Sequence, residues 1–184
     1  MNVTAFAASN SSRSINKQIA SSAANLLKEM QPEVAINLLD LNDYPLPIYS
    51  KDSEEENGIP QTARDFFQHI QNSDALIISF AEHNGSYAAV YKNLFDWCSR
   101  IQTRVYDQKK VLLLASSPGP KGGASVLEQA RTSMPFFGAT TMGAIHIPSF
   151  NQNFDSSTQK ITNPEIIAAI QAALLPLFPK ISGN

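Results

Sequence analysis

The stretch that decides the fold is AASNSSRSIN, residues 7–16, which joins the apolar run Val3–Ala8 to a long segment with helical spacing. A buried strand, a turn rich in hydroxyl and amide groups and a helix start form a layout suited to a phosphate. The free N–H groups of a helix N-terminus point at such an anion, and the helix dipole stabilises its negative charge. Ser and Asn side chains add donors without net charge. Because the same residue types are preferred helix N-caps, this stretch alone also fits an ordinary cap.

Beyond this stretch, short apolar runs alternate with segments in which apolar residues recur every three or four positions. The runs predict five strands, at residues 3–8, 34–41, 74–80, 110–116 and 140–147. The helical spacings predict helices over residues 14–31, 62–71, 88–101, 124–134 and 163–176. No internal repeat interrupts this alternation.

Most of the predicted strands are continuous apolar runs, which is typical of strands buried on both faces of a parallel sheet. We therefore predict an α/β fold: a flavodoxin-like three-layer sandwich, with a five-stranded parallel sheet of order 2-1-3-4-5 and helices on both faces. In that order the loops after the first, third and fourth strands meet at one edge. Ligands of such sheets bind there, outside the carboxyl ends of the strands.

The bulk properties of the chain exclude several classes of protein. We expect its 184 residues to form a single domain, residues 1–184. A net charge of −2, with no run among the 14 basic residues, argues against a nucleic-acid-binding face. No apolar stretch approaches the roughly 20 residues needed to cross a bilayer, and no secretory signal is recognisable. The lone cysteine, Cys98, fits a reducing compartment, so we expect a cytoplasmic protein that has no membrane partner.

Residues 42–60 form the longest stretch without regular periodicity. A loop of this length is usually functional or disordered. We interpret its acidic run, Glu54–Glu56, as a solvated face. The proline and aromatic residues of YPLPIY, residues 44–49, indicate a packed excursion that covers either a partner subunit or the core of its own subunit.

The three loops expected at the sheet edge differ in composition. The first supplies uncharged donors for a phosphate. The second combines Glu82, His83 and Asn84 with Gly85, which is free to adopt a left-handed backbone. The third, SPGPKGG at residues 117–123, is rich in Gly and Pro, so a flat ligand can approach its backbone closely. A phosphate at one end and backbone donors around a flat heterocycle fit a mononucleotide cofactor such as FMN.

At these positions the chain resembles the NADPH-dependent FMN reductase family, which includes quinone-, azo- and chromate-reducing members. The family's first loop commonly reads G-S-x-R-x-x-S-x-N; residues 8–16 keep its two serines and its asparagine, but Ala8 replaces the Gly and Ser11 the Arg. In the family's second loop, P-E-Y-N, Ala81 stands for Pro and His83 for Tyr. These departures bear on how tightly a flavin is held, and Arg13 is our candidate to replace the missing charge.

The remaining family motifs are matched more fully. The third loop, S-P-G-x-x-G-G, corresponds to residues 117–123, and the segment L-P-x-Y to residues 46–49. The most specific match is KNLFDWCSR, residues 92–100, to the family's K-N-x-x-D-W-x-S-R, because that combination rarely arises by chance. The resemblance spans nearly the whole chain.

The resemblance also implies a set of cofactor-binding residues. In the first loop it implies that Ser9, Ser14 and Asn16 hold the FMN phosphate, with Ser11 and Ile15 of the same loop in contact with the cofactor. In the second loop it implies that Glu82, His83, Asn84 and Gly85 lie along the isoalloxazine and the ribityl chain. In the third loop it implies that Ser117, Gly119 and Gly122 close the site from the other side.

The activity that the resemblance implies is an oxidoreductase in which FMN carries the chemistry. NADPH or NADH donates a hydride, and a quinone, a flavin or a similar small molecule accepts the electrons. No catalytic side chain is expected, and the family implies a homodimer or homotetramer. Two alternatives stay open: a non-enzymatic electron carrier of flavodoxin type, against which the charge of −2 argues mildly, and a relative with weakened flavin binding that acts as a binding protein.

Several residues also have a structural interpretation. Three scattered histidines and one cysteine have no metal-ligand spacing, so we expect no metal site. Cys98 lies on an apolar helix face and is expected to pack as a small hydrophobe. Asp96 is expected to pair with Arg100 one turn on. Glu82 fits a capping acid for the next helix as well as it fits a flavin contact.

Overall fold

A computed structural model describes residues 1–178 of the chain. Its centre is a five-stranded sheet of order β2-β1-β3-β6-β7 in which every neighbouring pair is parallel. The strands are β1 (Asn2–Ala8), β2 (Ala35–Leu39), β3 (Ala75–Phe80), β6 (Lys110–Ser116) and β7 (Thr140–Ile147). Counted along the chain, these five strands have the order 2-1-3-4-5, so the predicted flavodoxin-like topology is confirmed.

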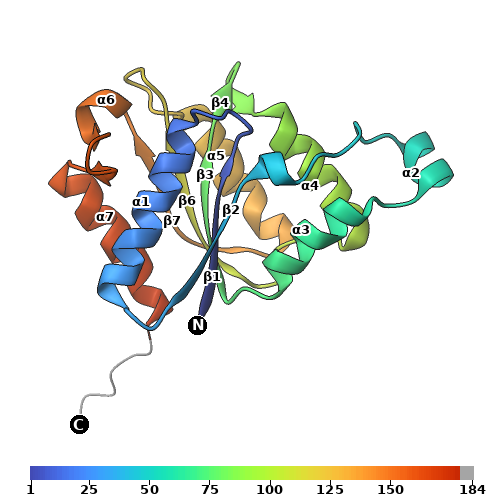
Figure 1. The fold of residues 1–184 in the computed structure, drawn as a ribbon, viewed down its shortest axis with the longest axis horizontal. Helices are drawn as coiled ribbons and strands as arrows, with labels where there is room; N and C mark the ends of the chain where they lie inside the picture. The colour runs from blue at the N-terminus through green and yellow to red at the C-terminus, as the bar shows by residue number, and fades with distance from the viewer. Residues whose placement is uncertain (179–184) are drawn as a thin grey trace, which may run out of the picture.

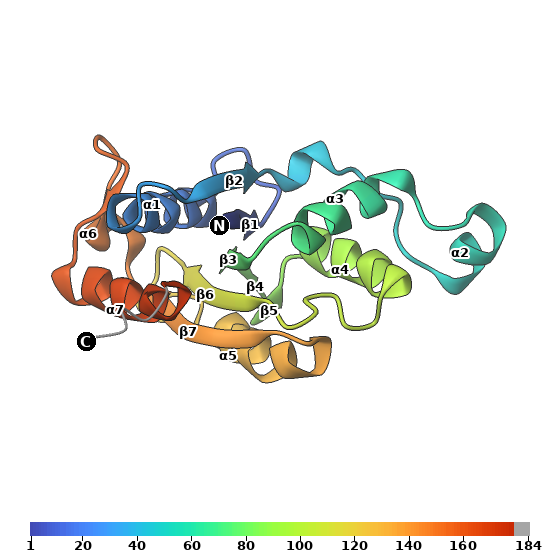
Figure 2. The ribbon, with the colours of Figure 1, turned by 90° about the horizontal axis from the view of Figure 1, so that it is seen from below.

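Helices cover both faces of the sheet, as Figure 2 shows from below. One face carries α1 (Ile15–Met30) and α7 (Pro164–Leu174), and the other carries α3 (Gln61–Gln71), α4 (Ala89–Ile101) and α5 (Ala124–Ser133). The predicted helices are therefore confirmed, with ends that differ by a few residues. None of the helices in residues 1–178 has both the length and the apolar character that crossing a bilayer requires.

Two hydrophobic clusters fill the spaces between the layers, because successive side chains of a strand point to opposite faces. On β3, Leu76 and Ile78 belong to the cluster under α3, α4 and α5, whereas Ile77 belongs to the cluster under α1 and α7. All six residues of β3 are buried, which explains its uninterrupted apolar sequence. The edge strands β2 and β7 are only partly buried.

Residues 42–60 contain more structure than the sequence predicts. A 3₁₀ turn, η1 (Leu41–Asp43), follows β2, and a short helix, α2 (Lys51–Asn57), projects from the body of the molecule (Figure 1). The prediction of no regular element was wrong for α2. Its helix begins at Ser50, whose hydroxyl accepts the N–H of Ser53, and no residue of α2 is buried, so no apolar stripe marks it in the sequence.

Residues 148–162, which lie between the last predicted strand and the last predicted helix, also contain regular elements. It forms α6 (Phe150–Asn153) and the two-stranded hairpin β8 (Phe154–Asp155) and β9 (Lys160–Ile161). The other short elements are the hairpin β4 (Glu82–His83) and β5 (Ser86–Tyr87), η2 (Met134–Phe137) and η3 (Leu175–Leu177). These pieces are too short for hydrophobic periodicity to reveal them.

Candidate functional site

The loops after β1, β3 and β6 lie at the same end of the sheet, at the top of Figure 1. This arrangement follows from the strand order, since the carboxyl ends of parallel strands share one edge. The loops are residues 9–14, residues 81–87 with the β4–β5 hairpin, and residues 117–123. The structure therefore brings together the three loops that the sequence singled out.

In the first loop, Ser14 is the N-cap of α1. Its hydroxyl oxygen accepts the N–H of Lys17 at 3.2 Å, and its carbonyl accepts the N–H of Gln18 at 3.4 Å. The N–H groups of Ile15 and Asn16 precede the first intrahelical bond, so they remain available to a ligand. The cap and the anion-binding interpretations are thus compatible here: one side chain starts the helix, and the helix start presents donors.

Ser9 and its neighbours complete the first loop. Ser9 is only 7% exposed, and its hydroxyl oxygen accepts the N–H of Ser11 at 3.2 Å, which leaves its proton free to donate. Ser11 and Arg13 are exposed, and Ile15 is half-buried. The loop therefore offers one oriented hydroxyl at its base and a positive charge on its outer side.

Asn16 has a different environment from the one expected of a phosphate ligand. Its side chain is buried and links α1 to two strands: the amide oxygen accepts the Ser79 hydroxyl at 2.8 Å and the Ser116 N–H at 2.9 Å, and the amide nitrogen donates to the Ser116 carbonyl at 3.1 Å. What Asn16 has free to offer a ligand is its backbone N–H. Sequence reasoning missed Ser79 and Ser116, because nothing local distinguishes a buried serine that receives a distant side chain.

The second loop is a tight hairpin rather than an open turn. His83 pairs with Ser86, and the two residues between them, Asn84 and Gly85, both have positive φ angles of 53° and 77°. An Asn-Gly pair is the preferred sequence for such a turn. His83, Asn84 and Gly85 are all exposed, so a ligand at this edge of the sheet can reach them. The left-handed backbone expected at Gly85 is confirmed.

Glu82 caps a helix, but not the one expected. Its carboxylate accepts the N–H of Val126 at 2.9 Å, in the first turn of α5 rather than of α4. The N-cap of α5 is Gly123, which has no side chain to serve that N–H. Glu82 therefore joins the second loop to the helix that follows the third, and Ser86 adds a second link through its bond to Gln129 at 3.0 Å.

The third loop has a backbone conformation that glycine adopts without strain. Gly122 has a φ of +57°, and a Cβ there would lie 2.7 Å from the nitrogen of Pro148. Gly119 is different: a Cβ there would meet only the Ser117 hydroxyl oxygen, at 3.9 Å. Its outer side is therefore open, and a ligand can approach the backbone. The Gly119 carbonyl is occupied, because it accepts the N–H groups of Gly122 and Ser149.

The motif at residues 92–100 forms hydrogen bonds and ion pairs that hold residues 44–60 against α4. The Trp97 indole N–H donates to the Pro47 carbonyl at 2.8 Å, and the Asn93 side chain exchanges hydrogen bonds with Pro47 and Tyr49. The excursion thus packs on α4 of its own subunit. Asp96 pairs with Lys92 and not, as predicted, with Arg100.

Arg100 instead pairs with Glu54 of α2, with its Nε 2.8 Å from one carboxylate oxygen. The choice of partner has a steric reason, because α2 brings a carboxylate to Arg100 while Lys92 lies one turn before Asp96 on the same helix face. Glu54 also accepts the Tyr49 hydroxyl at 3.1 Å. The acidic run is exposed apart from this residue's contacts, so the predicted solvated face holds for most of it.

Neither the thiol of Cys98 nor the carboxylate and imidazole groups of the described residues are arranged for catalysis or for metal binding. Cys98 is buried, as predicted, and burial raises the pKa of its thiol to about 12. Within residues 1–178 no three His, Cys, Asp or Glu side chains gather as metal ligands would. The chemistry that this edge supports is therefore the binding of an anion and a flat group by backbone donors, glycines and hydroxyls.

Comparison with known proteins agrees with this geometry. The sequence model of one protein family, described as NADPH-dependent FMN reductase, matches residues 1–152. The quinone reductase of Escherichia coli K12 is 31% identical over 115 residues, which cover 60% of this chain and 61% of that protein. The NADPH:quinone oxidoreductase of Arabidopsis thaliana is 30% identical over 123 residues, which cover 67% of this chain and 61% of that protein. The matches thus span about three fifths of the length of these relatives.

Among solved structures, FerB, a flavoenzyme NAD(P)H:(acceptor) oxidoreductase from Paracoccus denitrificans, superposes with a TM-score of 0.71 at 20% identity, and the match covers 94% of both chains. The azoreductase AzrA gives a TM-score of 0.66 at 21% identity and covers 95% of this chain and 98% of its own. At these identities the likeness establishes the shared fold.

Proposed function

The chain belongs to the NADPH-dependent FMN reductase family, and from this premise we propose that it is an FMN-dependent NAD(P)H oxidoreductase. A nicotinamide would supply the hydride, and a quinone, a flavin or a similar small molecule would accept the electrons. Relatives named quinone reductase and NADPH:quinone oxidoreductase support a quinone as the first acceptor to test.

The observation that carries this proposal is the donor set of the first loop. The free N–H groups of Ile15 and Asn16 and the spare proton of the buried Ser9 hydroxyl lie at the positive end of α1. No carboxylate belongs to this loop, and Arg13 adds a positive charge. These residues fit a phosphate monoester, which needs several donors and tolerates no nearby anion.

We assign the remaining contacts from the same geometry. Ser9, Ser11, Ser14, Ile15 and Asn16 would surround the phosphate, with Ser14 acting mainly by fixing the helix start and Asn16 through its backbone. The exposed hairpin residues His83, Asn84 and Gly85 would lie along the ribityl chain and the ring. Ser117, Gly119 and Gly122 would border the ring from the other side, where the open side of Gly119 permits close approach.

In the proposed reaction, the role of the protein is to bind and orient the cofactor. The three loops would hold FMN, which would supply the hydride-transfer chemistry when bound. Glu82 would act through α5, because its carboxylate fixes the first turn of the helix that follows the third loop. Backbone N–H groups of the loops would stabilise negative charge on a reduced ring. No side chain is assigned to proton transfer or to nucleophilic attack.

We further propose that the protein works in the cytoplasm as a homodimer or homotetramer. Support for self-association comes from the segment that carries α2 and projects from the body of the molecule (Figure 2). Ile48 in this segment is 78% exposed. On a segment that projects from the body of the molecule, such a side chain is available for contact with a second subunit.

The experiment that tests the proposed activity is steady-state oxidation of NADPH by the FMN-loaded protein, with 1,4-naphthoquinone as acceptor. We expect turnover that requires the protein, FMN and the quinone together. FMN binding without turnover would favour an electron carrier of flavodoxin type. A protein that neither binds FMN nor oxidises NADPH would favour the binding-protein alternative.

A further inference from the structure

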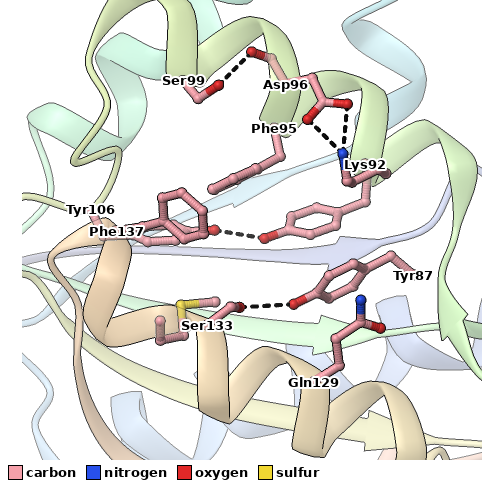
Figure 3. Close-up of a pocket in the computed structure, with 11 residues that line it drawn as sticks. Tyr87, Lys92, Phe95, Asp96, Ser99, Tyr106, Gln129, Ser133 and Phe137 are labelled. Atoms are coloured by element: carbon pink, nitrogen blue, oxygen red, sulfur yellow. Dashed lines mark hydrogen bonds and ion pairs between the residues drawn. The ribbon is translucent and has the colours of Figure 1, made fainter.

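A cavity of about 280 Å³ lies between α4 and α5, below the β4–β5 hairpin and apart from the phosphate loop. Figure 3 shows the side chains that line it. None of them is a residue that the family resemblance assigns to the cofactor. The cavity lining is Tyr87, Tyr91, Lys92, Phe95, Asp96, Ser99, Tyr106, Gln129, Ser133, Met134 and Phe137.

Five of the eleven residues that line the cavity are aromatic. Tyr87 and Tyr91 have ring centroids 5.1 Å apart, and Phe95 continues the series at 6.0 Å from Tyr91 and 4.6 Å from Phe137. Such spacing suits contact with the face or the edge of a further ring. The walls therefore favour a flat, mostly apolar ligand.

Inside the cavity, one hydroxyl proton has no acceptor. Tyr91 and Tyr106 are 4% and 1% exposed, and their hydroxyl oxygens lie 2.6 Å apart. Burial raises the pKa of both phenols, so both keep their protons at neutral pH. Two hydroxyls bring two protons, and a single bond between them uses one. Neither hydroxyl makes another hydrogen bond within residues 1–178, so the second proton is left unpaired.

A buried donor without a partner is costly, which points to an acceptor that occupies the cavity. A carbonyl oxygen on an aromatic ring system meets this need and also fits the ring-lined walls. The cavity lies just below the roughly 300–1,000 Å³ of common ligand pockets, so one or two fused rings suit it and a dinucleotide does not.

We propose that this α4–α5 cavity is a binding site for small aromatic carbonyl compounds of the quinone class, distinct from the flavin site. The ligand's carbonyl accepts the spare Tyr91 or Tyr106 proton, and its ring packs among Tyr87, Phe95 and Phe137. The exposed Lys92–Asp96 ion pair stands at the rim of the cavity (Figure 3). The site is a binding site only and requires no electron transfer.

The test uses methionine methyl groups as local reporters. The chain has four methionines, and Met134 is the one that lines this cavity, whereas Met30 and Met142 pack against the cluster on the other face of the sheet. In FMN-loaded protein with ¹³C-methyl methionine and no pyridine nucleotide, we expect 1,4-naphthoquinone to shift the Met134 signal saturably and to leave Met30 and Met142 unchanged. An unshifted Met134 signal, with only water in the cavity, would overturn the proposal.

Two matched comparisons test the hydrogen bond. Naphthalene has the same ring system without carbonyls, so the unaltered protein is expected to bind 1,4-naphthoquinone about 5- to 10-fold more tightly at this site. A Tyr91→Phe, Tyr106→Phe double variant should remove this preference while naphthalene binds as before. Equal affinities in the unaltered protein would refute the carbonyl assignment even if the double variant does not fold.

A third arm separates this site from the flavin. A Ser14→Asp variant places a negative charge at the proposed phosphate site and is expected to lose FMN. The Met134 response to 1,4-naphthoquinone should survive in that variant. If the response disappears together with the flavin, the quinone sits on the flavin and the α4–α5 site is wrong. If the unaltered, FMN-loaded protein shows no turnover while its Met134 response persists, the proposed function is wrong and this site stands.

Discussion

At the scale of single residues, the Ser14 hydroxyl connects the folding of α1 to the proposed function. Its oxygen faces the helix and accepts the N–H of Lys17, so its acceptor role is structural. The donors beside it belong to the backbone, and a change of charge at this position should affect an anion without removing the cap.

Ser14→Asp is therefore expected to keep the helix cap and to weaken FMN binding. Aspartate is as good an N-cap as serine, but a carboxylate near a phosphate is repelled. We expect at least a tenfold rise in the FMN dissociation constant, about 1.4 kcal/mol, with an unchanged melting temperature in the absence of FMN. Flavin fluorescence titration measures the first quantity, and thermal unfolding the second.

The matched control is Ser50→Asp, since Ser50 caps α2 in the same way, with its hydroxyl oxygen accepting the N–H of Ser53 at 3.0 Å. This variant should bind FMN as the unaltered protein does. Equal losses of FMN affinity in the two variants would show that the phosphate does not bind at the first loop.

Cys98 gives a second prediction at this scale. With a thiol pKa of about 12, only about one molecule in ten thousand carries the thiolate at pH 8, and the side chain is buried. We expect a thiol reagent such as Ellman's reagent to leave the native protein unlabelled at pH 8 and to label one thiol per chain in guanidinium chloride. Fast labelling of the native protein would show that α4 opens far more readily than its packing implies.

At the scale of elements, substitutions at two of the three glycines of the third loop, Gly119 and Gly122, should distinguish a loss of stability from a loss of FMN binding. Gly122→Ala is expected to lower the free energy of unfolding by about 1–3 kcal/mol, because its φ is +57° and its Cβ would collide with the Pro148 backbone. Gly119→Ala meets no atom closer than 3.9 Å, so it should fold normally and weaken FMN binding by obstructing the approach to the loop.

Urea unfolding and FMN titration of both variants check this pair. Unchanged FMN affinity in Gly119→Ala would mean that the open side of the loop does not face the cofactor. A loss of stability in this variant would mean that this side of the loop is not open.

How much of these elements the sequence could predict depended on where their stabilising contacts lie. β1, β3 and β6 are buried on both faces, so their apolar runs are local signals that predict these strands. The helix α2 has no buried residue and is stabilised by a cap and by the contacts of Glu54 with Arg100 and Tyr49. No apolar pattern in the sequence therefore predicts it.

In the candidate site, too, features with local signals could be predicted and pairings between distant residues could not. The three loops were predictable because turn residues follow apolar runs. Two side-chain roles were not, because their partners are distant in the chain: Asn16 bonds Ser116 one hundred positions away, and Glu82 caps a helix whose Val126 lies 44 positions away. Strand order predicts which loops meet, but it does not predict which atoms pair.

At the scale of the whole molecule, the projecting segment around α2 should govern self-association. Ile48→Asp puts a charge on a side chain that is 78% exposed, so it should leave the fold intact and dissociate the oligomer. Sedimentation velocity should find the unaltered protein at two or four times the 20.1 kDa chain mass and the variant at the mass of one chain. Phe136→Asp, at a residue that is 77% exposed on another element, is the control that should keep the oligomer. A monomeric unaltered protein would reject the interface.

At the scale of the whole molecule, we propose that three loops distant in the sequence form one FMN site at the sheet edge. The measurement that tests this claim most directly is the visible absorbance spectrum of the purified protein during titration with FMN, followed by NADPH without oxygen. We predict a saturable, perturbed flavin spectrum at one FMN per chain, which bleaches when NADPH is added. A spectrum that stays that of free FMN at every protein concentration would contradict the account.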